Sequence, residues 1–237
     1  MIKIFHSFLL ITLFISCSSD SNQNQTDETS PTVNFKLKKI YSNPTDSYEF
    51  FYNGNDISYT IETEGSYSYK REFSYNSNNV SNIKFYINGL YTSNHDILFI
   101  YNGSRITSSN TFDGSTDLYT NQFIYNSNNQ LIEEKQLKNN LYEVSSYFSY
   151  FPNGNIQTKS YSGTTMVVNY LYDDKINPEY YAYKSQISII SNYSKNNITQ
   201  DNYYKYTYEY NSNNLPIKKY TYSFSNTLIK TEFYEYY

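Results

Sequence analysis

A short aromatic motif followed by a turn recurs along the chain, and it constrains the fold more than any other feature. The string Tyr-Asn-Ser-Asn-Asn occurs three times, and looser variants with Asn-Gly or Pro-Asn-Gly lie between the copies. Successive copies are 22 to 26 residues apart, except for a gap of 38 residues before the last. A fixed period of this length indicates an array of one repeated supersecondary unit. The tyrosines that open the copies are Tyr52, Tyr75, Tyr101, Tyr125, Tyr150, Tyr172 and Tyr210.

Each unit has the pattern of a β-hairpin. Aromatic and polar residues alternate before the turn, as in residues 204–210, and this period of two places the aromatic side chains on one face of a strand. Asn-Gly and Asn-Ser-Asn-Asn tolerate positive φ and bond their own backbone, so the chain reverses there. A second alternating run follows, as in residues 131–137. We therefore interpret the seven repeat tyrosines as structural turn anchors.

Consecutive hairpins predict an all-β domain. The expected architecture is an antiparallel β-meander of about a dozen or more strands, forming a long twisted sheet curled into an open or closed barrel. The composition agrees, because 32 Tyr and 15 Phe suit strands, whereas Ala182 is the sole alanine. We expect most aromatic rings to fill the inner face. Residues 177–190, which contain Pro178, predict an irregular excursion or short helical turn packed on one rim.

The first residues have the pattern of an export signal. Lys3 precedes an apolar stretch that ends in Ser16-Cys17. This ending resembles the lipobox of bacterial lipoproteins, in which the cysteine becomes the lipid-bearing N-terminus. We expect a signal peptide over 1–16, a lipidated Cys17 with a flexible polar tether over 17–32, and the β-repeat domain over 33–237. The alternative is a secreted protein that loses Cys17, its only cysteine, with the signal.

The repeats resemble YD (RHS-type) repeats, in which an aromatic residue and Tyr-Asn/Asp precede a Gly or Asn and an Ile or Leu. Together with the lipobox, the element Tyr172–Pro178 and the aromatic C-terminus, they resemble a group of Gram-negative lipoproteins of unknown function. That resemblance implies a porin-like β domain. It also implies an outer-membrane location, with the lipid bilayer as a partner through acylated Cys17. It assigns no catalytic residues and leaves surface and periplasmic orientations open.

The residues that carry most catalytic chemistry are scarce. After signal removal His95 is the one histidine and no thiol remains, which excludes a cysteine nucleophile and a multi-histidine metal site. No nucleophile elbow, phosphate loop or dinucleotide fingerprint is present. The net charge of −4 and the scattered Lys and Arg argue against nucleic acid as a partner. We predict no cofactor, no metal site and no catalytic residue.

Adjacent carboxylates are the remaining enzymatic signal, and we interpret them as turn and surface charge. The leading hypothesis is a non-enzymatic domain that binds or scaffolds a glycan or a protein. The alternatives are a carboxylate-based hydrolase and a purely structural envelope component. A membrane-spanning barrel is disfavoured, because alternate strand positions are polar and the mean hydropathy is −0.71. The carboxylate pairs are Glu62/Glu64, Glu133/Glu134 and Asp173/Asp174.

Overall fold

Antiparallel strands account for most of the chain. A computed structural model describes residues 35–92, 95–113, 117–183, 187 and 193–237, so Cys17 and the tether lie outside the described residues. The elements are β1 (Leu37–Asn43), β2 (Asp46–Asn53), β3 (Asp56–Glu64), β4 (Tyr67–Asn76), β5 (Asn79–Ile87), β6 (Leu90–Tyr91), β7 (Ile97–Asn102), β8 (Arg105–Asp113), β9 (Asp117–Tyr125), β10 (Leu131–Lys138), β11 (Leu141–Tyr150), β12 (Ile156–Tyr161), β13 (Val167–Asn169), β14 (Leu171–Ile176), α1 (Pro178–Ala182), β15 (Asn196–Gln200), β16 (Lys205–Tyr210), β17 (Pro216–Tyr222) and β18 (Leu228–Tyr236).

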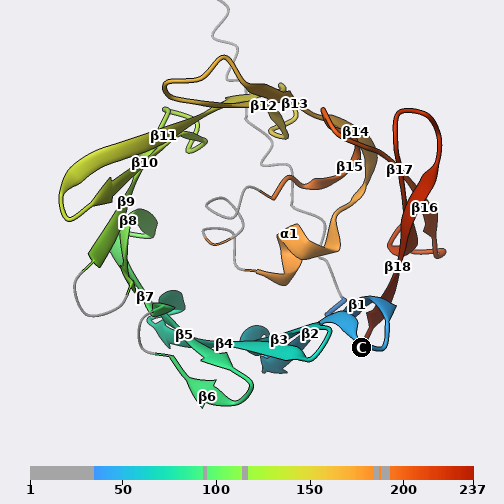
Figure 1. Cartoon of the computed structure of the whole chain (residues 1–237), viewed down its shortest axis with the longest axis horizontal. Coiled ribbons are helices and arrows are strands. Elements are labelled where there is room, and N and C mark those ends of the chain that lie inside the picture. The colour runs from blue at the N-terminus through green and yellow to red at the C-terminus, as the bar shows by residue number, and fades with distance from the viewer. Residues whose placement is uncertain (1–34, 93–94, 114–116, 184–186, 188–192) are drawn as a thin grey trace, which may run out of the picture. The chain divides into compact units, whose positions relative to one another are not determined.

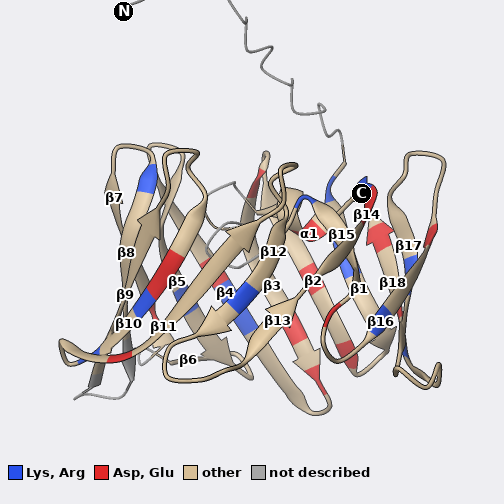
Figure 2. Cartoon of the chain, turned by 90° about the horizontal axis from the view of Figure 1, so that it is seen from above, with Lys and Arg blue, Asp and Glu red and all other residues tan. Residues whose placement is uncertain are grey.

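The strands of residues 35–237 form one sheet that curls into a barrel. Most neighbours in sequence pair in antiparallel fashion, β5 pairs with both β6 and β7, and β1 pairs with both β2 and β18. The ring that results is seen end-on in Figure 1, and Figure 2 shows the strands from the side, running between two rims. The predicted all-β meander, curled into a barrel, is confirmed.

One seam remains in the ring, where β13 is followed almost at once by β14. β13 pairs with β12, whereas β14 pairs with β15, so the chain changes partners near Tyr170. Asparagine side chains complete the hydrogen bonding at this point. The Asn202 amide accepts from the backbone N–H of Asn169 at 2.9 Å and donates to the carbonyl of Val167, as a neighbouring strand would. Deeper in the seam the buried Asn155 donates to Asn196 Oδ1 at 2.9 Å.

The repeated turns sit at the positions that the motif predicts, and they have left-handed backbone conformations. Ser77 and Asn78 have φ of 49° and 70°, and Gly54 has φ of 59°. The later copies of Tyr-Asn-Ser-Asn-Asn form a longer loop with one positive φ, at Asn129 and at Asn214. The first copy closes a two-residue turn in which Tyr75 pairs with Val80, whereas Tyr125 pairs with Leu131 and Tyr210 with Pro216, one residue later.

A β-bulge follows most of these turns and changes which side chains face inward. Tyr52 pairs with Ile57, but Phe51 pairs with Tyr59, so one extra residue lies in β3. Similar register shifts occur beside five more of the repeat tyrosines. The inward positions therefore run Ile57, Thr60 and Glu62 instead of strictly alternating from Ile57. Ile57 and Thr60 are both buried, which agrees with this phase.

The segment after β14 turns into the barrel. Asn177 caps α1 by accepting from the Glu179 backbone N–H at 3.1 Å, and its side chain donates to the Ser194 carbonyl at 3.0 Å. We call the described residues of 177–195 the inner segment. The predicted short helical turn is confirmed, but its predicted place on a rim is wrong, because α1 lies inside the ring (Figure 1). The segment covers apolar wall residues, and Ile187 joins the core cluster that includes Phe50.

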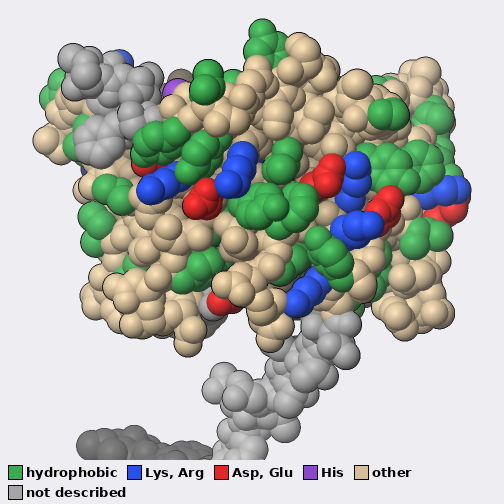
Figure 3. Space-filling model, turned by 90° about the horizontal axis from the view of Figure 1, so that it is seen from below, with side chains coloured by type: hydrophobic (Ala, Val, Ile, Leu, Met, Phe, Trp, Pro, Cys, Tyr) green, Lys and Arg blue, Asp and Glu red, His purple; other side chains and the backbone are tan. Residues whose placement is uncertain are grey.

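The outward faces of the strands carry paired charges. Lys70 bonds Glu72 at 2.8 Å and Lys39 bonds Glu49 at 3.0 Å, on the faces opposite to Arg71 and Ile40. Figure 3 shows Lys, Arg, Asp and Glu mixed across the middle of one outer side. Within the described residues, no helix is both long enough and apolar enough to span a membrane.

Candidate ligand-binding cavity in the barrel lumen

A cavity of about 540 Å³, partly open to solvent, lies between the inner segment and the wall formed by β17, β18, β1 to β5 and β7. This volume is within the range of sites for small molecules. Its lining combines tyrosine rings with a high density of charge, which is unusual for the interior of a protein of this size. The charged residues of the lining are Asp46, Glu62, Arg71, Glu179, Lys219, Lys230 and Glu232.

An ion pair from neighbouring strands forms one side of the cavity. Arg71 Nη2 on β4 donates to Glu62 Oε2 on β3 at 2.8 Å. The guanidinium also lies 5.7 Å from the ring centroid of Tyr48 and 5.8 Å from that of Phe85, within the range of a cation–π contact. The hydroxyl of Tyr48 is hydrogen-bonded to the hydroxyl of Tyr183 from the inner segment. This hydrogen bond connects this side of the cavity to the inner segment.

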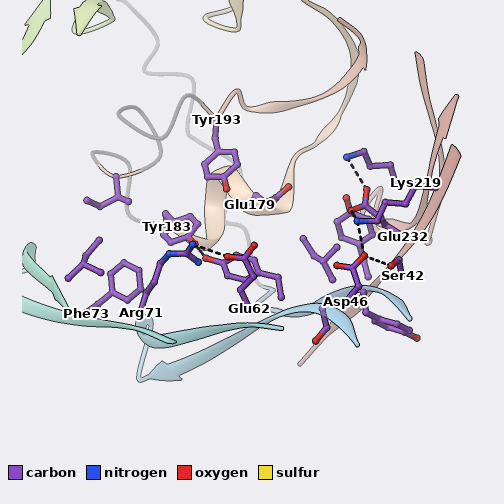
Figure 4. A pocket seen from close by; sticks show the side chains of 18 of the residues that line it. Ser42, Asp46, Glu62, Arg71, Phe73, Glu179, Tyr183, Tyr193, Lys219 and Glu232 are labelled. Atoms are coloured by element: carbon purple, nitrogen blue, oxygen red, sulfur yellow. Dashed lines mark hydrogen bonds and ion pairs between the residues drawn. The ribbon is translucent and has the colours of Figure 1, made fainter. Parts of the chain in front are cut away.

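A chain of charges forms the opposite side (Figure 4). Lys219 Nζ lies 3.1 Å from Glu232 Oε2, and Lys230 Nζ lies 3.3 Å from the other oxygen of the same carboxylate. Lys230 also contacts Asp46 Oδ2 at 3.1 Å. Ser42 donates to Asp46 at 2.5 Å, and this bond, together with Lys230, lowers the pKa of Asp46. Asp46 is therefore held as an anion.

Glu179 of α1 projects between these two groups, toward the tip of Tyr193 (Figure 4). Burial raises the pKa of Glu179, and the charge of Glu232 adds to the rise, whereas Lys219 and a hydrogen bond from Tyr193 oppose it. The pKa of the Tyr193 hydroxyl is raised in turn, first by the Glu179 charge and then by burial. Tyr193 stacks on Tyr183 with ring centroids 5.8 Å apart. The cavity thus presents a carboxyl group whose protonated form is favoured by burial.

The seven repeat tyrosines lie outside this cavity, and most of them form hydrogen bonds to other repeats or strands. Four of the hydroxyls donate to a backbone carbonyl 15 to 21 residues upstream, close to the turn of the preceding repeat. Tyr172 accepts from Ser194 Oγ at 2.9 Å and Tyr210 donates to Asp173. The hydroxyl of Tyr125 is buried and has no partner among the described residues. The four carbonyl bonds run from Tyr52 to Leu37, Tyr75 to Ile57, Tyr101 to Val80 and Tyr150 to Leu131.

Of the carboxylate pairs weighed in the sequence, only Glu62 lines the cavity. Glu64 is exposed at the end of β3, and Asp174 is exposed on β14. Asp173 accepts from the Asn197 backbone N–H at 3.2 Å and anchors β15. Burial raises the pKa of Glu134, which faces a different part of the wall. The three carboxylate pairs therefore do not converge on one site in the structure.

His95 is exposed in a short turn after β6, and Glu133 accepts from Ser145 Oγ at 2.8 Å. Among the described residues, no group of three or more His, Cys, Asp or Glu side chains is placed to hold a metal ion.

Sequence reasoning missed the residues of the cavity other than Glu62. One available signal was the element Tyr172–Pro178. Asp173 ties β14 to β15, and Asn177 with Pro178 starts α1, so this element builds the base from which Glu179 enters the lumen. Arg71, Lys219 and Glu232 carried no signal, because they resemble the Lys and Glu residues that occupy the outer face.

Comparison with known proteins identifies the fold. No protein-family model matches the chain, and no curated protein matches it. A solved structure that does match is described as a porin-like protein from Bacteroides uniformis. The match covers 85% of this chain and 98% of that chain, with a TM-score of 0.53 and 11% sequence identity. At this identity the likeness shows a shared fold. The porin-like fold implied by the resemblance is therefore confirmed, whereas relationship to YD repeats and membership of the lipoprotein group stay predictions.

Proposed function

We propose that this protein is a non-enzymatic lipoprotein of the bacterial outer membrane, anchored through acylated Cys17, whose barrel binds a small glycan in its lumen. The observation that carries the binding role is the cavity itself. It offers five tyrosines and seven charged groups at one place. Tyrosine rings pack on the apolar faces of sugars, and charged groups bond their hydroxyls.

The outer face supports a tethered barrel instead of a membrane-spanning one. A lipid-facing band would have to bury the Lys70–Glu72 and Lys39–Glu49 pairs in hydrocarbon, at a cost of about 2–4 kcal/mol for each lysine at the midplane. The lumen also contains the inner segment, which reduces the space for a water-filled pore (Figure 1). Both features favour a binding protein over a channel.

A glycan array probed with the purified mature domain tests the binding role. The cavity variant is Arg71→Gln with Glu62→Gln, which removes an ion pair without leaving an unpaired buried charge. The matched control is Lys70→Gln with Glu72→Gln, on the same strand but on the outer face. We expect the cavity variant to lose the glycans that the wild type retains and the control to keep them. Equal loss or equal retention by both variants would count against the lumen site.

The anchor and the orientation need a separate experiment. Protease or a membrane-impermeant label, added to intact cells, would reach a surface-exposed domain and would miss a periplasmic one. Substitution Cys17→Ala should release the domain from the membrane fraction in either case. Retention of the variant in that fraction would contradict anchoring through Cys17.

A carboxylate-based hydrolase is the second candidate, and one observation favours it. Burial raises the pKa of Glu179, as a general acid needs, and a second carboxyl group, Glu232, lines the same cavity in salt bridges with two lysines. Incubating the retained glycans with the wild type and with Glu179→Gln tests it. New reducing ends produced by the wild type alone would establish hydrolysis, and intact glycans with both proteins would support binding without turnover.

A further inference from the structure

If Glu179 is ionised, the charges of the cavity do not balance once each is assigned a partner. The lining contains four carboxyl groups and three cations. Glu62 is paired with Arg71, and Glu232 and Asp46 share Lys219 and Lys230. Glu179 forms no salt bridge among the described residues, and its hydrogen-bond donor is the neutral hydroxyl of Tyr193. The site therefore has a place for one more positive charge.

The surroundings of Glu179 reinforce this conclusion. Burial makes its ionised form costly, so the empty site favours the protonated carboxyl. Aromatic groups surround it, and tyrosine rings attract cations through their π faces. β1 presents only the uncharged Ile40 and Ser42 beside Tyr41 at the cavity. The titratable groups that interact with Glu179 are Lys219 on β17, Glu232, Tyr234 and Tyr236 on β18, Tyr208 on β16 and Tyr193 of the inner segment.

Other ligand charges fit less well. An anionic ligand would have to displace Glu62 from Arg71 or Glu232 from its two lysines, leaving a carboxylate without its partner. A neutral ligand would leave Glu179 protonated and would gain no ion pair from it. A protonated amine supplies the charge that Glu179 lacks and disturbs no existing pair.

We propose that the glycan bound in the lumen carries a free amino group, and that its ammonium is seated against the Glu179 carboxylate. This inference rests on the proposed function and specifies its ligand as an amino sugar. Binding converts Glu179 from its protonated to its ionised form, and the released proton passes to solvent. No bond to carbon forms or breaks.

Calorimetry with two matched disaccharides tests the inference. The probes are the disaccharide of β-1,4-linked glucosamine and its fully N-acetylated counterpart, which differ in the charged amines. At about pH 5–6, where the sugar amines are protonated, we expect the wild type to bind the free amine at least about tenfold more tightly. Repeating the titration in buffers of different ionisation heat should reveal release of up to about one proton, in proportion to the fraction of Glu179 that is protonated before binding.

The variant Glu179→Gln keeps the size of the side chain and removes its charge. It should fold, because it replaces a costly buried carboxyl, and it should bind both disaccharides equally without proton release. The control Glu72→Gln on the outer face should retain the wild-type preference. Equal binding of the two probes by the wild type, binding of neither, or a preference that survives in Glu179→Gln would overturn the inference. The glycan array decides the proposed function separately, since neutral glycans retained through the cavity would uphold it even then.

Discussion

Hydrogen bonds from the repeat tyrosines to upstream carbonyls should stabilise the barrel one repeat at a time, and the chain contains its own control. Tyr150 donates to the Leu131 carbonyl at 2.7 Å, and Leu131 is fully buried. Substitution Tyr150→Phe removes the donor and leaves that carbonyl with one bond fewer in a place that water does not reach. The expected loss of unfolding free energy is about 1–2 kcal/mol.

Tyr125 occupies the equivalent position in the preceding repeat, but its buried hydroxyl has no partner among the described residues. Substitution Tyr125→Phe removes an unsatisfied polar group at almost constant volume, so stability should stay the same or rise. Urea unfolding followed by far-ultraviolet circular dichroism would compare the two variants. In thermal melts of the same variants, we expect the Tm of Tyr150→Phe to be lower by about 2–8 °C. A loss in Tyr125→Phe as large as that in Tyr150→Phe would refute the role given to these hydrogen bonds.

Three further predictions concern the inner segment, the seam and the lumen carboxyl. Asn177→Ala removes the cap of α1 and the bond to the Ser194 carbonyl. It should lower the unfolding free energy by about 1–2 kcal/mol and weaken glycan binding in a calorimetric titration. The variant Asn139→Ala, at an exposed position, is the control for general effects on binding in the same titration. Asn155→Ala removes the hydrogen bond in the buried part of the seam and should lower the free energy of unfolding in urea by about 2–3 kcal/mol. If Asn202→Ala, in the exposed part of the seam, lowers the free energy of unfolding by as much, Asn155 does not seal the barrel. The raised pKa of Glu179 means that its carboxyl group binds a proton more tightly in the folded state than in the unfolded chain, where its pKa has the ordinary value of 4.5. The stability of the wild type should therefore fall relative to that of Glu179→Gln as the pH rises above 4.5. Parallel pH profiles of the Tm of the two proteins would contradict this prediction.

The fold was predictable from the sequence because local signals and the global architecture agree. Alternating aromatic residues indicate strands, and the Asn-rich turns adopt positive φ at Asn78, Asn129 and Asn214. The identical pentapeptide nevertheless forms two kinds of loop. Tyr75 pairs with Val80 in the first copy, whereas Tyr125 pairs with Leu131 and Tyr210 with Pro216 in the other two, so the pentapeptide alone does not set the loop.

The cavity was not predictable, for two physical reasons. A bulge after most of the repeat turns shifts the inward face by one residue, and in β3 a strict alternation from Ile57 would place Glu62 outside. Closure of the ring then brings β3 and β4 near β17 and β18, which are far apart in sequence. Glu179 enters that space on a segment that the sequence pattern predicted to lie on a rim. The residues that face Glu179 across the cavity become its neighbours only when the barrel closes.

A structure of the protein with the glycan that it binds most tightly would test the lumen site most directly. The mature domain would be crystallised with the best ligand from the array, and the electron density would locate the sugar. We predict density in the cavity between α1 and β18, with a sugar amine beside Glu179 and a ring face against Tyr183 or Tyr193. Sugar density on the outer tyrosines or on a rim, with the cavity filled only by water, would contradict a lumen binding site.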